Sequence, residues 1–220
     1  HANTPADIVT SHSKRGRTLH RPEVKDRLSS LRKRWWRQPP AAPPQLRMRF
    51  AQNAPPPLEA LETPYRLRRY REGDEIGWAA LLNGRGELGS WTHERLGAEI
   101  SSFLVADTQH FVLCDLEIVS GAGVYERSSV CWEIGWVATS PDHRGRGLAR
   151  HVCIATVAAA LELPSRPIVL VTDDFRTQAI KLYLRLGFLP DCHHHSHPGR
   201  WRILFEQLGP EYAHYVGSNI

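Results

Sequence analysis

The 220-residue chain contains no apolar run close to the roughly 18 residues that a membrane-spanning helix needs. Its first residues, His1-Ala2-Asn3-Thr4, lack the basic and then apolar pattern of a secretory signal peptide. These two absences argue against a membrane span and against a secreted protein. The chain also lacks an initiator methionine, so we expect it to be processed, trimmed or a fragment.

Cysteine is scarce, with only four residues in the chain, and no two of them form a C-x-x-C pair. Three lie in apolar segments, where a free cysteine behaves as a small hydrophobic residue. Wide spacing without pairs argues against a disulfide framework and against a paired-cysteine zinc site. A reducing, cytoplasmic setting therefore fits best. The four are Cys114, Cys131, Cys153 and Cys192.

Positive charge is concentrated at one end, although the net charge of the whole chain is only +5. Residues 1–50 carry 12 Lys and Arg against 3 Asp and Glu, whereas residues 51–220 carry 16 against 20. Proline-rich stretches at residues 39–44 and 55–57 add linker character. We expect residues 1–57 to be a tail, either a solvated, disordered extension or a basic arm for RNA, an anionic membrane or a partner protein.

Hydrophobic patterning predicts a mixed order of strands and helices in residues 58–220. Strands are expected at residues 65–70, 103–105, 110–119, 130–138 and 167–172, and helices at residues 72–82, 92–100, 148–163 and 179–186. Residues 202–206 fit either a closing strand or a turn of helix. This order favours one α/β domain in which helices cover a single sheet.

The segment from Arg144 to Ala149 contains two glycines and leads into a predicted helix. The strand before it ends at Ala138, and residues 139–143 have the composition of a turn. Glycine lets backbone N–H groups approach a ligand closely, and the unpaired N–H groups of a first helical turn favour an anion. The segment is therefore either a phosphate site or a tight turn with solvated arginines.

A second motif follows one helix and one strand later. The first, Arg144-Gly145-Arg146-Gly147-Leu148-Ala149, fits the pattern R/Q-x-x-G-x-G/A, and the second, residues 179–188, fits A-x-x-L-Y-x-x-x-G-F. In this order and at this separation the two resemble the GNAT superfamily of acyl-CoA-dependent N-acyltransferases. The resemblance covers about residues 65–190.

The resemblance implies a fold, a co-substrate and a set of binding residues. It implies a mixed, mostly antiparallel sheet flanked by helices, in which the strands at residues 130–138 and 167–172 splay apart. Acetyl-CoA would place its pyrophosphate on the backbone N–H groups of Arg144, Gly145, Arg146, Gly147, Leu148 and Ala149. Val137 and Ala138 would face the acyl-pantetheine arm, where a backbone amide could polarise the thioester carbonyl. No metal is implied.

Two residues are candidates for proton transfer. Tyr183 occupies the family's general-acid position, and a phenol with an ordinary pKa near 10 is protonated at neutral pH. Glu133 is a candidate general base, since a carboxylate beside apolar residues can have a raised pKa. It is equally an ordinary exposed strand residue, and a water chain could replace it. Glu117 and His110 are weaker candidates for the base.

One position departs from the family pattern. Many members have asparagine three residues before the helix alanine, where this chain has Arg176. The segment Asp173-Asp174-Phe175-Arg176 is similar to that of a mycothiol-synthase-like bacterial subgroup. Arg176 could bind the pantetheine arm or a phosphate, or pair with Asp173 or Asp174.

Histidines gather in the segment from Asp191 to His197. Its Cys and His residues are contiguous and not spaced like a structural zinc site, so we expect a polar loop, which could line the acceptor pocket. Four tryptophans form either an aromatic acceptor wall or ordinary core: Trp78, Trp91, Trp132 and Trp136.

Two functions remain open at this stage. The first is transfer of an acetyl group from acetyl-CoA to a primary amine, on a small molecule or a peptide, by direct attack in a ternary complex. No cysteine or serine nucleophile is required for it. The second is an acyl-CoA-binding or regulatory module of the same fold with little catalysis, whose basic tail contacts RNA or a partner protein. The sequence does not indicate the acceptor or the oligomeric state.

Overall fold

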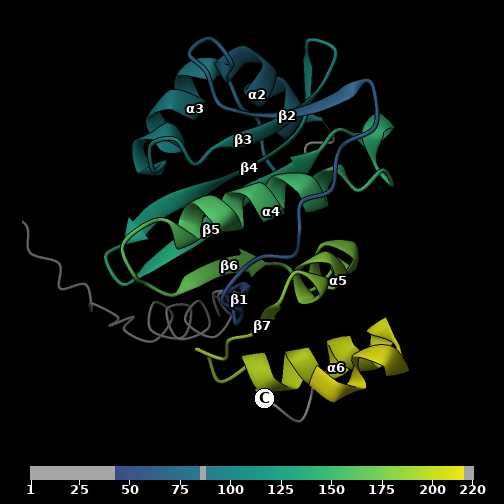
Figure 1. Cartoon of the computed structure of the whole chain (residues 1–220). Coiled ribbons are helices and arrows are strands. Elements are labelled where there is room, and N and C mark those ends of the chain that lie inside the picture. Colours follow the sequence, from purple (N-terminus) through teal and green to yellow (C-terminus); the bar gives the residue numbers. More distant parts are fainter. Residues whose placement is uncertain (1–42, 85–87, 216–220) are drawn as a thin grey trace, which may run out of the picture. The chain divides into compact units, whose positions relative to one another are not determined.

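A computed structural model describes residues 43–84 and 88–215, and these residues contain a seven-stranded sheet (Figure 1). The strands are β1 (Leu46–Phe50), β2 (Tyr65–Arg69), β3 (His110–Cys114), β4 (Glu117–Ser128), β5 (Cys131–Thr139), β6 (Ile168–Thr172) and β7 (Phe188–Pro190). Their order across the sheet is β2-β3-β4-β5-β6-β1-β7. Only β5 and β6 pair in parallel, so the expected mixed, mostly antiparallel sheet is confirmed.

Helices cover both faces of this sheet. They are α2 (Glu75–Asn83), α3 (His93–Glu99), α4 (Leu148–Leu161), α5 (Thr177–Arg185) and α6 (His197–Leu208), with 3₁₀ turns η1 (Ser101–Phe103), η2 (Pro141–His143) and η3 (Pro210–Tyr215). Phe111 of β3 packs edge-on against Trp78 of α2, whereas the next residue, Val112, shares a buried cluster with Val152 of α4. Because successive strand residues point to opposite faces, α2 and α4 lie on opposite faces of the sheet.

The predicted helices are confirmed within a few residues at their ends. Thr92 caps α3 by accepting a hydrogen bond from the backbone N–H of Arg95 at 3.2 Å. Gly187 follows α5 with φ +94°, the left-handed conformation that suits glycine after a helix. Residues 202–206, which fitted a strand or a helix, lie within α6.

Two strand predictions were wrong in detail. Residues 110–119 do not form one strand, because Cys114 pairs with Glu117 and the chain reverses at Asp115, whose φ is +53°. Aspartate tolerates this left-handed conformation better than most residues do. The second half of this hairpin, β4, runs on to Ser128, and its residues after Val119 were not predicted to be a strand. The expected strand at residues 103–105 is only a single bridge between Leu104 and Tyr125 after η1.

The boundary of the predicted tail was also wrong. Residues 46–50 form β1, which is hydrogen-bonded to β6 on one side and to β7 on the other. Leu46 and Met48 are fully buried, because the apolar residues of this Leu-Arg-Met-Arg-Phe segment alternate with arginines and point into the core. The remainder of the tail, residues 1–42, lies outside the described residues.

The parallel pair β5 and β6 separates soon after it forms. Only Trp132 and Glu133 of β5 have partners in β6, although β5 continues to Thr139. On its other side β5 carries a bulge, since its register with β4 shifts between Gly123 and Gly121 and Trp136 has φ +51°. The expected splay is therefore present, and the outer half of β5 has an edge that β6 does not pair.

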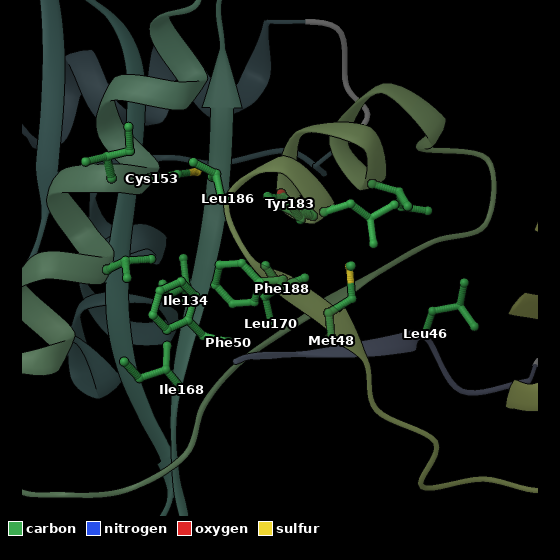
Figure 2. Packing of buried hydrophobic residues seen from close by; sticks show 14 of the residues in the cluster. Leu46, Met48, Phe50, Ile134, Cys153, Ile168, Leu170, Tyr183, Leu186 and Phe188 are labelled. Carbon is green, nitrogen blue, oxygen red and sulfur yellow. The ribbon is translucent and has the colours of Figure 1, made fainter. Parts of the chain in front are cut away.

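A large apolar cluster connects α5 to the strands beside it (Figure 2). Met48 and Phe50 of β1 belong to it together with Phe188 of β7, whose ring centroid lies 5.3 Å from that of Phe50. Tyr183 of α5 and Cys153 of α4 belong to the same cluster, so α5 and α4 share this part of the core. This packing fixes the position of Tyr183 relative to β5 and β6.

Within residues 43–84 and 88–215, no helix has the length and apolar character required to cross a membrane.

Candidate functional site

A cavity of about 700 Å³ lies where the start of α4, the outer half of β5 and α5 meet. Its walls come from Val137, Ala138 and Thr139 of β5, from the glycine turn, from residues 175–179 and from α5. Leu81 and Leu82 at the end of α2 complete it. This volume is within the roughly 300–1,000 Å³ that is usual for small-molecule sites.

The glycine turn has the geometry that an anion site requires. Gly145 and Gly147 have φ +77° and +73°, which is the left-handed region, and Gly147 directly precedes α4. An added Cβ at either glycine would meet no atom within 4 Å, so the space beside the turn is open to a ligand. The first N–H groups of α4 have no partner within the helix and lie beside this space.

The two arginines of the turn differ in position. Arg144 lines the cavity, and its Nε donates to the backbone oxygen of Thr139 at 3.3 Å. Arg146 does not line the cavity, because its guanidinium lies 5.9 Å from the ring centroid of Tyr65 on β2. The other residues of the predicted phosphate site line the cavity, namely Gly145, Gly147, Leu148 and Ala149.

The sequence prediction missed His143, which precedes the turn. Its Nδ1 lies 3.0 Å from the hydroxyl of Tyr65, and the two rings meet edge-on. His143 lines the cavity, so Tyr65 holds the imidazole in the cavity wall beside the glycine turn. The histidine was visible in the sequence, but its partner lies 78 residues away and no sequence pattern links them.

Val137 and Ala138 lie on the outer half of β5, in the wall of the cavity. The bulge at Trp136 and the loss of pairing with β6 occur at the same place. Unpaired edge N–H groups next to a cavity can donate to a ligand carbonyl, since the backbone holds them in fixed directions.

Tyr183 lies at the buried end of the cavity, on α5. Its side chain is 6% exposed and packs edge-on against Phe188 (Figure 2). Burial raises the pKa of the phenol well above its usual range; Cys153 adds to the effect and Arg176 opposes it. A phenol with a raised pKa stays protonated at neutral pH.

Arg176 lines the cavity where α5 begins. Its Nε lies 2.9 Å from Oδ2 of Asp173, so one of the two expected ion pairs forms. Asp174 pairs with Arg200 of α6 instead, at 2.8 Å. Desolvation is the largest single effect on the pKa of Asp173, and it raises that pKa. The hydrogen bonds from Arg176 and Gln45 together outweigh desolvation, so the pKa of Asp173 is lowered. The position that is often asparagine in the GNAT family thus carries a cation fixed by a carboxylate.

Glu133 is outside the cavity wall in the described residues, at the point where β5 and β6 separate. It pairs across the sheet with Tyr125, which belongs to the core beneath α2 and α3, so its side chain points to that face. Its Oε1 lies 3.4 Å from Nε of Arg127. Burial raises the pKa of Glu133, while Arg127 and Arg47 oppose this shift.

His110 and Glu117, the two weaker candidates for the base, do not line the 700 Å³ cavity. His110 is buried, and its Nδ1 lies 3.0 Å from the backbone oxygen of Thr108. Desolvation lowers its pKa, so it is a neutral core residue. Glu117 lies beside a smaller hollow of about 260 Å³ near α2.

The histidine-rich segment is divided between a loop and the start of α6. Asp191 lies 3.0 Å from both Arg47 and His193, and His197 is buried at the first position of α6. Across the described parts of the chain, no three His, Cys, Asp or Glu side chains are grouped to hold a metal ion. None of residues 191–197 lines the 700 Å³ cavity.

The four tryptophans are mostly core residues. Trp78 is fully buried, and Trp132 is 5% exposed within the large apolar cluster. Trp91 and Trp136 meet edge-on with centroids 4.9 Å apart beneath α2 and α3. These four residues support the fold and do not line the cavity.

Comparison with known proteins agrees with this arrangement. The model of a family described as the Acetyltransferase (GNAT) family matches residues 30–188. A mycothiol acetyltransferase from Thermobispora bispora is 30% identical over 155 residues, which are 64% of this chain and 52% of that protein. The chain thus spans about half the length of this curated relative.

Solved structures resemble the fold. A GCN5-related N-acetyltransferase from Sphaerobacter thermophilus has a TM-score of 0.53 and 23% identity, over 68% of this chain and 50% of that chain. Another GCN5-related N-acetyltransferase, from Kribbella flavida, has a TM-score of 0.50 and 15% identity, over 68% and 55%. At these identities the likeness concerns the fold alone. The matching family model spans well over half of the chain and includes both the glycine turn and the α5 motif, and on that basis the chain belongs to the GNAT acetyltransferase family.

Proposed function

We propose that the protein transfers an acetyl group from acetyl-CoA to a primary amine by direct attack in a ternary complex. The observation that carries the proposal is a cavity lined both by the open glycine turn before α4 and by the buried Tyr183 of α5. Members of the GNAT family use acetyl-CoA, whose thioester supplies an activated acetyl group.

The glycine turn suits the diphosphate of acetyl-CoA, and the apolar wall of the cavity suits its pantetheine arm. The open space beside Gly145 and Gly147 fits a diphosphate, which the N–H groups of α4 would bind. Arg144 adds positive charge there. Inward from the turn, the apolar side chains of Val137 and Leu182 suit the pantetheine arm.

Two groups would act on the reacting atoms. A backbone N–H at Val137 or Ala138 would stabilise the negative charge that develops on the carbonyl oxygen. The hydroxyl of Tyr183 would donate its proton to the departing thiolate, because burial keeps the phenol protonated. Cys153, also nearby in the core, is unsuited to covalent catalysis since burial raises the pKa of its thiol to about 12.

The acceptor would reach the thioester from the face of the sheet that α2 and α3 cover, opposite to the face that α4 covers. Glu133 points to that face where β5 and β6 separate, and a bound water could relay a proton from the amine to its carboxylate. We propose a small-molecule primary amine as the acceptor. The support for this is the similarity to a protein named mycothiol acetyltransferase, which reaches 30% identity over part of each chain.

The proposed function is tested by measuring thiol release from acetyl-CoA against a panel of small amines, amino acids, peptides and aminoglycosides. We expect at least one class to raise thiol release well above the rate of acetyl-CoA hydrolysis, with a matching N-acetylated product by mass spectrometry. Tight acetyl-CoA binding without turnover on any amine would instead support a binding or regulatory module.

The pH dependence of kcat/KM tests Glu133 as the base. Its pKa is raised above the ordinary value of 4.5, so the active carboxylate form appears only as pH rises through that higher pKa. The amine must also be neutral, so log kcat/KM should rise with a slope of 2 at low pH and 1 above the pKa of Glu133. Glu133→Gln should leave a slope of 1 at all pH values below the pKa of the amine and lower kcat/KM about 100-fold or more. An unchanged break in the variant's profile would assign that break to another titrating group and would rule out Glu133 as the base.

A further inference from the structure

Phe175 is an exposed aromatic residue at the rim of the cavity. Its side chain is 72% exposed, and the residue lies two positions before α5. A single exposed apolar residue is common on protein surfaces and needs no explanation by itself. Phe175 differs from the other exposed phenylalanine in the described residues, Phe103, because it lines the 700 Å³ cavity and Phe103 does not.

The ring of Phe175 also has a fixed neighbour. The guanidinium carbon of Arg176 lies 5.0 Å from the ring centroid, within the range of a cation–π contact. Arg176 is held by Asp173, and Asp173 also accepts a hydrogen bond from Gln45 at 2.9 Å. A cation on one face of an aromatic ring, with the ring still largely exposed, leaves a flat surface that suits another flat aromatic group.

The cavity has an inner and an outer end, which orients a long ligand. Tyr183 is 6% exposed at the inner end, whereas Phe175 is 72% exposed and Gly145 and Gly147 are also exposed. Along α5, Tyr183 lies six positions after Thr177, which is near the rim, a rise of about 9 Å. With the thioester at Tyr183 and the diphosphate at the glycine turn, the remaining part of CoA, its adenosine, extends towards the rim.

We propose that Phe175 is the stacking surface for the adenine of acetyl-CoA. The proposal rests on the proposed function, since it needs CoA in the cavity. The adenine packs on the exposed face of the phenylalanine ring while Arg176 occupies its other face. Phe175 thus contributes to the affinity for the nucleotide end of the co-substrate and makes no contact with the reacting thioester.

The test compares two ligands that share the pantetheine arm. CoA carries 3′-phosphoadenosine 5′-phosphate, whereas 4′-phosphopantetheine lacks this whole nucleotide part. Because phenylalanine, alanine and leucine are uncharged, a change in the ratio of the two Kd values on substitution of Phe175 reports its contact with the nucleotide part. We expect Phe175→Ala and Phe175→Leu to weaken CoA binding about 5- to 10-fold, near the lower end for one stacked base, without changing the affinity for 4′-phosphopantetheine. Phe175→Trp should retain or improve CoA binding, and Phe103→Ala should match the unmodified protein. Each Kd is measured by isothermal titration calorimetry on the full chain.

Three results would overturn the proposal. An unchanged ratio in both Phe175→Ala and Phe175→Leu would show that adenine does not contact this ring. A full retention of CoA affinity in Phe175→Leu alone would indicate an apolar contact rather than stacking. Equal weakening of both ligands would place Phe175 beside the pantetheine arm. In each case CoA still binds the unmodified protein, which separates these results from failure of CoA binding itself, where neither ligand binds. Failure of acetyl transfer alone is detected separately, by the thiol-release measurement, and leaves these Kd values unaffected.

Discussion

Replacing Tyr183 with phenylalanine is expected to lower kcat for acetyl transfer about 100- to 1,000-fold, the range usual for the loss of a general acid. The reason is that the departing thiolate then has no proton donor at the buried end of the cavity. The ring remains, so the edge-on contact with Phe188 and the packing of α5 are retained. We therefore expect the Kd for acetyl-CoA, measured by calorimetry, to change by less than about threefold.

A matched control for this substitution lies nearby. Tyr212 is 5% exposed, and its hydroxyl accepts a hydrogen bond from Arg185 at the end of α5, but it does not line the cavity. Tyr212→Phe removes the same hydroxyl from a similarly buried ring and should leave kcat within about twofold. A Tyr183→Phe enzyme that keeps most of its turnover would rule out this hydroxyl as the acid. A parallel loss in acetyl-CoA affinity would instead assign Tyr183 to binding.

The backbone conformation of the glycine turn and of the end of α5 was predictable from local sequence. Gly145 and Gly147 have the left-handed φ values for which glycine is the usual residue, and Gly187 ends α5 in the same way. Each of these features depends on a few adjacent residues. A short motif therefore carries nearly all of the information that its backbone conformation requires.

Other parts of the site depend on contacts between distant residues. Leu81 and Leu82 enter the cavity wall from α2, and Tyr65 reaches His143 from the far edge of the sheet. Arg146 belongs to the motif, yet it faces Tyr65 and not the cavity. Side-chain direction at such positions is set by the neighbouring elements, which a linear pattern does not describe.

The face of the sheet to which the Glu133 side chain points could be assigned only from the residue that pairs with it on the neighbouring strand. Alternation along β5 places Glu133 opposite to its neighbours Trp132 and Ile134, but it does not say which face is the core beneath α2. Pairing with Tyr125 settles the direction, since Tyr125 packs under α2 and α3. The prediction of Glu133 as the base still depends on the pH profile described above.

Substituting Met48 with alanine is expected to lower the free energy of unfolding by about 2–5 kcal/mol, the usual cost of truncating a fully buried side chain. Met48 is 0% exposed, in the middle of β1, and it packs in the cluster that also holds Phe188 and Tyr183 (Figure 2). The proline-rich flanks led to the prediction of a tail here, although the alternation of Leu46, Met48 and Phe50 already had the period of a strand. Urea unfolding followed by circular dichroism measures the change.

Arg49→Ala is the matched control for that substitution, because Arg49 is the next residue of the same strand and is exposed. It should change the free energy of unfolding by no more than about 0.5 kcal/mol. Similarly small changes in the free energy of unfolding for both variants would mean that residues 46–50 belong to a dispensable tail. A deletion of residues 1–57 removes β1, the strand that joins β6 to β7. Such a deletion cannot test the role of the basic segment alone, since it separates β7 and the Gly187 turn from the rest of the sheet.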